Sequence, residues 1–329
     1  MDISAIYHDE IPDFIREFAS AEAMTRLKNI GMNCGLEYTS FPIYGSCGPC
    51  SRYEHSLGTA LIVWHFTKEM KQALAGLFHD ISTPVFAHVV DFLNKDYMEQ
   101  ESTEEKTREL IVGSEAICRL LDKYKISPEE VCDYHRYPIA DNDSPRLSAD
   151  RLEYTLSNAI NFQKRPYAEV KSYYDDLTVI SNEDNQPELA FKNEEPASAF
   201  TRTAIVNSRL YVADADRYSM QFLADILRLA LDRGILTEDD LYTTEPAVIN
   251  KLKAHKETAE LWTKFRSFSK IITQADNPGK PYWISVPAKK RYINPLVAGK
   301  GRISELNEDI KSQIEDFLRL DYDYWMLAE

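Results

Sequence analysis

Histidine is scarce in this chain, and most of the histidines lie close together. The sequence has seven, and four of them fall between residues 55 and 88. His79 is followed directly by Asp80 at the end of an apolar stretch, and an imidazole beside a carboxylate at a helix end offers two ligands for a divalent metal ion. His55, on the preceding predicted helix, and Asp150, on a later one, are suitable sources of two further ligands. This pattern predicts a metal site.

An arginine accompanies these candidate ligands. Arg52 lies three residues before His55, so the two side chains share one face of a helix. A guanidinium beside a metal ligand suits a phosphate oxygen, because its planar donors match phosphate geometry. The combination therefore indicates chemistry on a phosphorylated substrate.

A second motif, Cys47-Gly48-Pro49-Cys50, directly precedes Arg52 and suggests a different chemistry. A redox dithiol of this spacing normally needs a βαβ context, with its first cysteine at a helix N-terminus. Here a loop comes before the motif and helices follow it. A zinc knuckle with Cys34 lacks a fourth ligand. We therefore expect a tight turn that presents the arginine, and the redox alternative stays open.

Helical periodicity dominates the elements that must position these residues. Apolar spacing and start signals such as Thr83-Pro84 predict helices in the following stretches: 11–27, 52–71, 72–80, 84–94, from about 149, 196–234 and 304–320. Capping boxes at 102–105 and 127–130 predict two more helix starts. Two short strands are expected around the polar turn in 177–193, and the basic stretch AKKRY, residues 288–292, is expected to be a solvated hairpin.

Composition limits the possible partners. The formal net charge of −15 repels a phosphate backbone, which argues against non-specific binding of nucleic acid, although a metal ion and local arginines can invert the field inside one cleft. The acidic N-terminus does not resemble a signal peptide, and no apolar run reaches the ~18 residues of a membrane span. Five cysteines suggest reduced thiols. We expect a cytoplasmic protein.

Three segments, in the same order, resemble the HD-domain metal-dependent phosphohydrolases, and most closely their deoxynucleoside triphosphate triphosphohydrolase branch. The segments are SRYEHSLG, AGLFHDISTPVFAHVVD and SADRLEY. Three ordered matches are far more specific than a single His-Asp pair. The similarity extends more loosely from Ile11 to Leu241, and the last ninety or so residues have no firm match. The resemblance implies a mainly α fold, an HD-domain helical bundle with small peripheral β elements.

The resemblance also implies roles for individual residues. His55, His79, Asp80 and Asp150 would bind one divalent ion (Mn, Fe, Zn, Mg or Ni), and a water activated by that ion would attack phosphorus. Arg52 would hold a phosphate.

Further positions match residues outside the metal set. Arg151 and Tyr154 match positions that contact the nucleotide in that branch. His88 and Asp91 match catalytic or metal-supporting positions, although a buried structural pair is an equal alternative for them.

Two positions depart from the family pattern. Thr83 stands where the triphosphohydrolases carry a histidine four residues after the first histidine of the His-Asp pair, and Glu104 stands where they carry another. Both histidines belong to the proton-transfer apparatus. Threonine cannot protonate a leaving oxygen near neutral pH, whereas a sufficiently buried Glu104 could. The metal ligands are intact, and the acid–base set is altered.

These observations predict a phosphohydrolase domain over residues 1–240 and a mixed helical and β appendage over 241–329. The favoured activity is release of triphosphate from a (deoxy)nucleoside triphosphate. A phosphomonoesterase or phosphodiesterase of the same superfamily remains open, and so does a nucleotide-binding regulatory protein with a retained metal site and weak turnover. We expect a homo-oligomer that acts on a nucleotide or another small phosphorylated compound.

Overall fold

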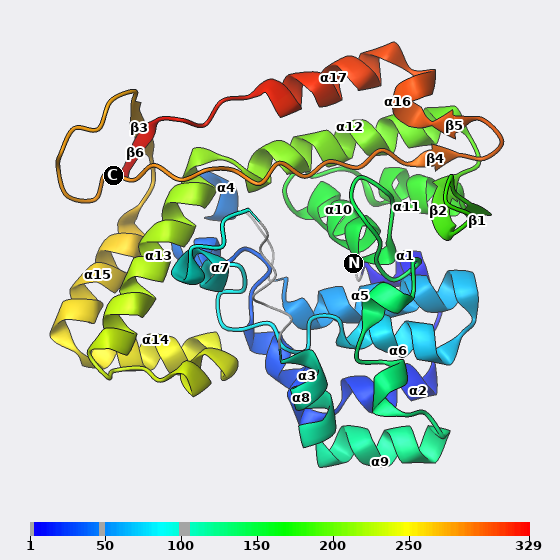
Figure 1. Cartoon of the computed structure of the whole chain (residues 1–329), viewed down its shortest axis with the longest axis horizontal. Coiled ribbons are helices and arrows are strands. Elements are labelled where there is room, and N and C mark those ends of the chain that lie inside the picture. Colours follow the sequence, from blue (N-terminus) through cyan, green and yellow to red (C-terminus); the bar gives the residue numbers. More distant parts are fainter. Residues whose placement is uncertain (1–2, 46–49, 99–105) are drawn as a thin grey trace.

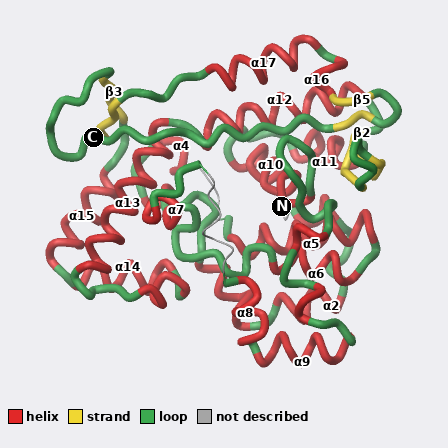
Figure 2. Tube along the Cα trace, in the orientation of Figure 1, coloured by secondary structure: helices red, strands yellow, loops and turns green. Residues whose placement is uncertain are grey.

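The structure is a computed structural model that describes residues 3–45, 50–98 and 106–329. Helices build most of it, and the few strands are short and lie at its edges (Figures 1 and 2). The expected mainly α fold is therefore confirmed. Within the described ranges, no helix combines the length and apolar character needed to cross a bilayer.

The N-terminal region is broken into short helices. They are α1 (Ser4–Tyr7), α2 (Asp13–Ala19), α3 (Glu22–Thr25) and α4 (Pro42–Gly45). The single helix predicted over 11–27 is thus interrupted, because Ala21 takes an extended conformation and starts a new element. Buried side chains such as Phe18 and Leu27 still fall on one face, which explains the helical periodicity of the sequence.

Two helices that follow each other in the sequence pack together and position part of the candidate site. Helix α5 (Arg52–Thr67) begins with a capping box made by Ser51 and Glu54, and α6 (Met70–Phe78) follows after a short turn. A Cβ on Gly76 would lie 3.2 Å from the side chain of Val63, so glycine lets α6 approach α5 closely. This packing holds the N-terminal end of α5 near the C-terminal end of α6.

A third helix, α10 (Ala149–Asn161), packs across α5. Its N-cap is Ser148, whose hydroxyl accepts a hydrogen bond from the backbone N–H of Arg151. A Cβ on Gly58 of α5 would lie 2.7 Å from the side chain of Glu153, so the close approach of these two helices also depends on a glycine.

The stretch between α6 and the next helix differs from its prediction. Helix α7 spans Val89–Asn94 instead of starting at Pro84. Phe86 and Ala87 adopt positive φ angles of 59° and 48°, so the chain turns there before the helix can begin. Helices α8 (Thr107–Gly113) and α9 (Glu115–Tyr124) follow. The capping box at 127–130 opens only a 3₁₀ turn, and the one at 102–105 lies outside the described residues.

The rest of the chain alternates longer helices with short strands. The elements are α11 (Tyr167–Asp175), β1 (Leu177–Ser181), β2 (Pro187–Phe191), α12 (Glu194–Tyr211), α13 (Asp214–Asp232), α14 (Glu245–Ala254), α15 (Lys256–Ser267), β3 (Ile271–Gln274), β4 (Leu296–Val297), β5 (Gly301–Arg302), α16 (Ile303–Leu306), α17 (Glu308–Arg319) and β6 (Trp325–Ala328). The two predicted strands within 177–193 are confirmed as β1 and β2, and most of the predicted helix over 304–320 is found as α17.

The C-terminal ninety residues pair with and pack against the rest of the chain. Strand β4 pairs in parallel with β2, and β3 pairs with β6 near the C-terminus. Buried side chains from before and after residue 240, such as Leu223 and Trp262, belong to one hydrophobic core. The division into 1–240 and 241–329 stays a prediction, and the structure describes continuous packing across it.

Candidate metal and phosphate site

Three helices bring the four candidate metal ligands together. His55 lies in the first turn of α5, His79 and Asp80 follow the end of α6, and Asp150 lies in the first turn of α10. The two imidazoles and Asp80 are buried, and their ligand atoms lie within 4.8 Å of one another. Residues separated by almost a hundred positions in the sequence therefore meet at one point.

The distances between ligand atoms suit one divalent ion. The Nε2 atoms of His55 and His79 are 3.1 Å apart, and the Oδ1 atom of Asp150 lies 3.0 and 3.6 Å from them. The Oδ2 atom of Asp80 lies 3.8 and 3.6 Å from the same two nitrogens. Ligands held about 2.0–2.2 Å from one ion are separated by about 2.8–3.6 Å when they are neighbours around it. His55, His79 and Asp80 lie close enough to share one metal ion, and Asp150, which lies beside both imidazoles, stays a predicted fourth ligand.

The orientation of each imidazole supports the same conclusion. The Nδ1–H of His55 donates to Glu153 at 2.5 Å, and the Nδ1–H of His79 donates to the carbonyl of Gly76 at 2.7 Å. In its neutral form, which is the form that binds a metal ion, each imidazole then carries its lone pair on Nε2, and the two Nε2 atoms face each other. Such an arrangement is favourable when a cation lies between them, and it is typical of metal-binding histidines.

Glu153 is a supporting residue that sequence reasoning missed. It is buried, accepts hydrogen bonds from Ser157 and Tyr7, and lies one helical turn after Asp150. That spacing on α10 was the available signal, because residues three apart project from the same side of a helix. A carboxylate on the second nitrogen of a ligating imidazole fixes its tautomer and increases its basicity.

The electrostatics of the cluster favour an added cation. Burial opposes the charged form of Asp80, but Arg52 and the two imidazoles hold the pKa of this carboxyl well below its usual range. Burial likewise opposes protonation of His55, yet Glu153 and Asp150 raise the pKa of that imidazole to about 10. A place that stabilises an extra positive charge on an imidazole has a strongly negative potential, and it also stabilises a metal ion.

Arg52 lies next to this cluster and lines the cavity that extends from it. Its guanidinium donates from Nη1 to both carboxylate oxygens of Asp80, at 3.0 and 2.9 Å, and both side chains are buried. The arginine therefore orients the carboxylate. Its predicted contact with a substrate phosphate stays a prediction.

The two predicted nucleotide contacts also line the cavity. Arg151 is held by Asp141, at 2.9 Å, and by the side chain of Asn142, also at 2.9 Å. The ring of Tyr154 lies 6.5 Å from the ring of His55, and burial raises the pKa of its hydroxyl to about 12. Both residues are in place beside the cluster, and their contact with a nucleotide stays a prediction.

The altered acid–base positions separate in the structure. The Thr83 hydroxyl is buried and donates to Oδ1 of Asp80 at 2.9 Å, which makes it a positioning residue for that carboxylate. His88 lines the cavity and its Nδ1 pairs at 2.8 Å with Asp91, a fully buried carboxylate at the start of α7. Glu104 lies outside the described residues. His88 is one of several titratable groups among the described residues that line the cavity, together with His135 and Asp216.

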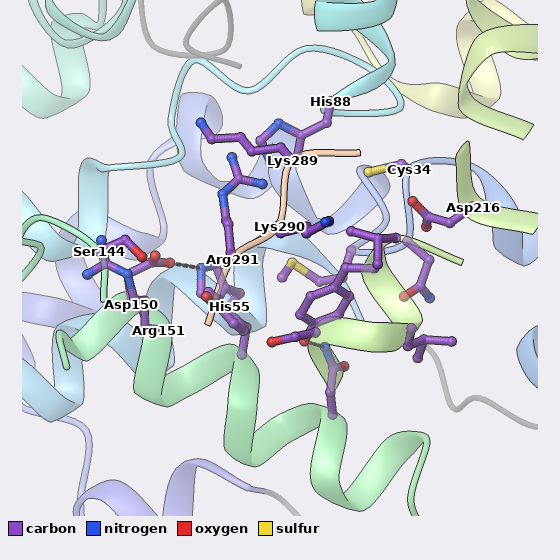
Figure 3. Close-up of a pocket in the computed structure, with 18 of the residues that line it drawn as sticks. Cys34, His55, His88, Ser144, Asp150, Arg151, Asp216, Lys289, Lys290 and Arg291 are labelled. Atoms are coloured by element: carbon purple, nitrogen blue, oxygen red, sulfur yellow. Dashed lines mark hydrogen bonds and ion pairs between the residues drawn. The ribbon is translucent and has the colours of Figure 1, made fainter. Parts of the chain in front are cut away.

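A cavity of about 540 Å³ extends from the cluster. Asp150, Arg151 and Ser144 lie on one side of it, and Cys34 and Asp216 lie on the opposite side (Figure 3). Aromatic and apolar side chains also line the cavity: Phe92, Tyr134, Phe162, Tyr211, Val212 and Met220. The space is large enough for a small phosphorylated molecule with an apolar or aromatic portion.

The basic stretch 288–292 differs from its prediction. It forms no hairpin; Lys289, Lys290 and Arg291 belong to an extended segment and line the cavity. Figure 3 shows the three side chains above the cluster. No pattern in the sequence predicts this placement, because a long connection between distant elements has no periodicity.

Only one cysteine of the Cys-Gly-Pro-Cys motif is described. Burial raises the pKa of the Cys50 thiol to about 12, so the thiol stays protonated near neutral pH. Catalytic dithiols depend on a lowered pKa instead. Residues 47–49 lie outside the described residues. Cys50 borders the N-cap of α5, and the predicted turn before it stays a prediction.

The chain has relatives of known sequence, although no protein-family model matches it. The chain is 30% identical over 225 residues to the uncharacterized protein YdhJ of Bacillus subtilis, a match that covers 68% of this chain and 67% of that protein. This chain belongs to the same family as YdhJ.

Two more distant relatives have also been found. The metal-dependent phosphohydrolase cns2 of Cordyceps militaris is 27% identical over 311 residues, which cover 90% of this chain and 84% of that protein. The uncharacterized protein MG461 of Mycoplasma genitalium is 26% identical over 180 residues, which cover 48% and 41% of the two chains. The name of cns2 agrees with the chemistry that the buried His-His-Asp cluster can support.

Proposed function

We propose that this protein is an HD-type metal-dependent phosphohydrolase that acts on a small phosphorylated substrate, with nucleotides as the favoured class. One observation carries the proposal. The imidazoles of His55 and His79 are both committed through Nδ1, and their Nε2 atoms converge with the carboxylates of Asp80 and Asp150. A distant relative that shares nearly the whole chain is named a metal-dependent phosphohydrolase, which supports the same reaction class.

The protein's own groups divide the work of such a reaction. A bound divalent ion would lower the pKa of a water molecule toward neutral pH, and the ion would also polarise the phosphoryl oxygen. The two histidines and two aspartates hold that ion, and Glu153 fixes the tautomer of His55. Arg52, oriented by Asp80, presents further N–H groups to a phosphate oxygen.

The surroundings support a nucleotide as the substrate. Tyr154, Phe162 and Tyr211 line the cavity and offer aromatic surfaces for a sugar and a base. Within this class, the resemblance of the three sequence segments favours a (deoxy)nucleoside triphosphate triphosphohydrolase. A metal ion of still undetermined identity is the cofactor, and the expected homo-oligomer is part of the same proposal.

One observation favours a second reaction within the same superfamily. The Thr83 hydroxyl is occupied with Asp80, so it does not replace the histidine that triphosphohydrolases use at this position. His88, paired with Asp91, remains at the cavity to protonate a leaving oxygen. A phosphomonoester or phosphodiester whose leaving group lies against His88 would then react better than an ordinary dNTP. In the regulatory alternative, a nucleotide-binding protein with weak turnover, the missing histidine at position 83 has little consequence.

A substrate panel with product identification tests the proposal. The purified protein, loaded in turn with Mn, Fe, Zn, Mg and Ni, is incubated with nucleoside mono-, di- and triphosphates and with simple phosphate esters. Ion chromatography then distinguishes triphosphate, pyrophosphate and phosphate as products. Triphosphate release supports the favoured reaction, and phosphate release supports a phosphomonoesterase. If every metal-loaded form leaves all compounds intact, the hydrolase proposal is wrong.

His88→Ala separates the catalytic alternatives. General acid–base catalysis contributes roughly 10²–10⁴-fold. If His88 protonates the leaving group, the variant loses about that factor in kcat and also loses the fall of activity at high pH. Metal content should be unchanged, since the residue lies outside the metal cluster. A variant with the wild-type pH profile would exclude His88 as the acid.

A further inference from the structure

A long extended segment, residues 279–295, connects β3 to β4 and is named the strap below. Figure 1 shows it as the orange chain that runs along the length of the molecule, past α13 and α12, to reach β4. Apart from an isolated bridge between Ile284 and Met326, it contains no regular secondary structure. Figure 3 shows the part of the strap that carries Lys289, Lys290 and Arg291 in the pocket with His55 and Asp150.

Buried and specific contacts fix the strap on both sides of this point. Arg217, which is almost completely buried, donates to the carbonyl of Val286 at 2.6 Å. The ammonium of Lys290 donates to the carbonyl of Leu318 at 2.6 Å, near the end of α17. Such anchors indicate a preorganised segment rather than a loosely attached loop.

The strap is fixed beyond the cluster as well. The backbone N–H of Asn294 donates to the carbonyl of Pro145 at 2.8 Å. The side chain of Ile293 is buried in the core. Position 291 therefore lies between anchors at 290 and 294, where the chain has little freedom.

Arg291 is directed into the cavity from this fixed position. Figure 3 shows its side chain together with His55 and Asp150 in the pocket, and Tyr154 lines the same cavity. Arg291 is half-buried, and no carboxylate among the described residues forms an ion pair with it. Arg52 and Arg151 are each paired with an aspartate.

The charges around the cluster show what this arginine adds. The other arginines of the described lining, Arg52, Arg151 and Arg217, are each paired with an aspartate. Arg291 differs from them, because no ion pair neutralises its charge within the described part of the chain. A positive charge held in a partly desolvated cavity attracts an anion much more strongly than one in water.

We propose that Arg291 on the strap forms an anion subsite that binds a second phosphate group of the substrate, beyond the phosphate at the metal ion. The subsite selects oligophosphates over monophosphates. This inference rests on the proposed function, because it assigns the substrate class of the same cavity. The fork of N–H groups on a guanidinium matches two oxygens of one phosphate, which a lysine cannot do.

Binding of inorganic anions tests the subsite without any turnover. Isothermal titration calorimetry would measure the affinities of tripolyphosphate and of phosphate for the metal-loaded protein, with the divalent ion in excess. Wild type should bind tripolyphosphate more tightly. Arg291→Ala should reduce that affinity roughly 10- to 100-fold, the effect of losing hydrogen bonds to a charged group, and should change phosphate binding much less. Arg291→Lys should show an intermediate loss.

Two controls make the result specific. Lys300→Ala removes one positive charge from the same C-terminal region, outside the cavity, and should leave both affinities unchanged. Arg291→Gln retains most of the side-chain volume and serves if the alanine variant is unstable. Metal content and thermal unfolding should match wild type in each variant.

Each outcome decides between the two proposals. If wild type shows no preference for tripolyphosphate, or if Arg291→Ala keeps its affinity within about twofold, the subsite does not exist. If Arg291-dependent binding is found but no phosphorylated compound is hydrolysed, the proposed function fails and the subsite stands. If hydrolysis occurs and Arg291 has no influence on binding or on KM for triphosphates, the proposed function stands and the subsite does not exist.

Discussion

Two groups of buried or partly buried carboxyl groups differ in the way they are neutralised. Asp80 and Asp150, in the metal cluster, meet an arginine and two imidazoles. Their pKa values lie well below the usual range, because these cationic partners outweigh the burial that opposes ionisation. They remain charged and keep their oxygens directed to one point.

The second group consists of Glu37 and Glu245. Glu245 is buried and accepts hydrogen bonds from the backbone N–H of Gly31 and from the hydroxyl of Tyr38. Within the described part of the chain, no lysine or arginine pairs with either glutamate. Burial and the neighbouring Glu245 raise the pKa of Glu37 to about 7, and burial also raises the pKa of Glu245.

The contrast shows how a fold decides what its buried acids do. A carboxyl group with a built-in cation stays ionised and can bind a metal ion, whereas burial without a paired cation favours the protonated form. Each group contains two carboxyl groups. The ion pair with Arg52 and the contacts with two imidazoles distinguish the candidate site from the second group.

Removing a carboxylate from the cluster should have the largest effect. Asp80→Asn keeps the shape of the side chain and removes its charge, so the protein should fall from about one bound divalent ion to a trace, and any hydrolytic activity should be lost with it. Mass spectrometric metal analysis of the purified variant provides the measurement. Asp239→Asn, an exposed aspartate, is the control. Full metal content in Asp80→Asn would show that the cluster binds no ion through this residue.

Weakening the support of one ligand should have a smaller effect. Glu153→Gln retains an acceptor for the Nδ1–H of His55 but loses the negative charge, so metal affinity should fall roughly 10- to 100-fold. Competition with a chelator measures the affinity. Ser157→Ala removes only a hydrogen bond to the other oxygen of Glu153 and should cost much less. Equal losses in the two variants would mean that packing, and not charge, maintains His55.

The helices that carry His55 and Asp150 could be predicted from the sequence, with starts near residues 52 and 149, and α5 and α10 begin there. The binding of a metal ion by these residues stays a prediction. The convergence of these ends in space follows from helix packing that local patterns do not encode. Family resemblance in three segments supplied it instead.

The rest of the cavity escaped prediction for physical reasons. Arg291 lies on a strap without periodicity, and its position depends on contacts with residues as distant in sequence as Arg217. The start of α7 was misplaced because positive φ angles at Phe86 and Ala87 are unusual for these residue types. The domain boundary near residue 240 and the cytoplasmic location stay predictions.

The smallest expected effect concerns the second carboxyl pair and is a dependence of stability on pH. The pKa of Glu37 is about 7 in the folded protein and near 4.5 in the unfolded chain. Between these values the folded state binds more protons, so its stability is complete below pH 4.5 and declines as pH rises through 7. Glu37→Gln should remove this decline, which we expect to be about 1–3 kcal/mol, and should leave metal binding unchanged.

Urea unfolding of wild type and Glu37→Gln at pH 5, 6.5 and 8 checks this expectation. The difference between their free energies of unfolding should change with pH in favour of the variant, which should gain on wild type toward pH 8. Glu260→Gln, an exposed glutamate on α15, should track wild type throughout. A constant difference between Glu37→Gln and wild type would mean that Glu37 is ionised at all three pH values and is neutralised like Asp80, so the contrast between the two carboxyl groups would be lost.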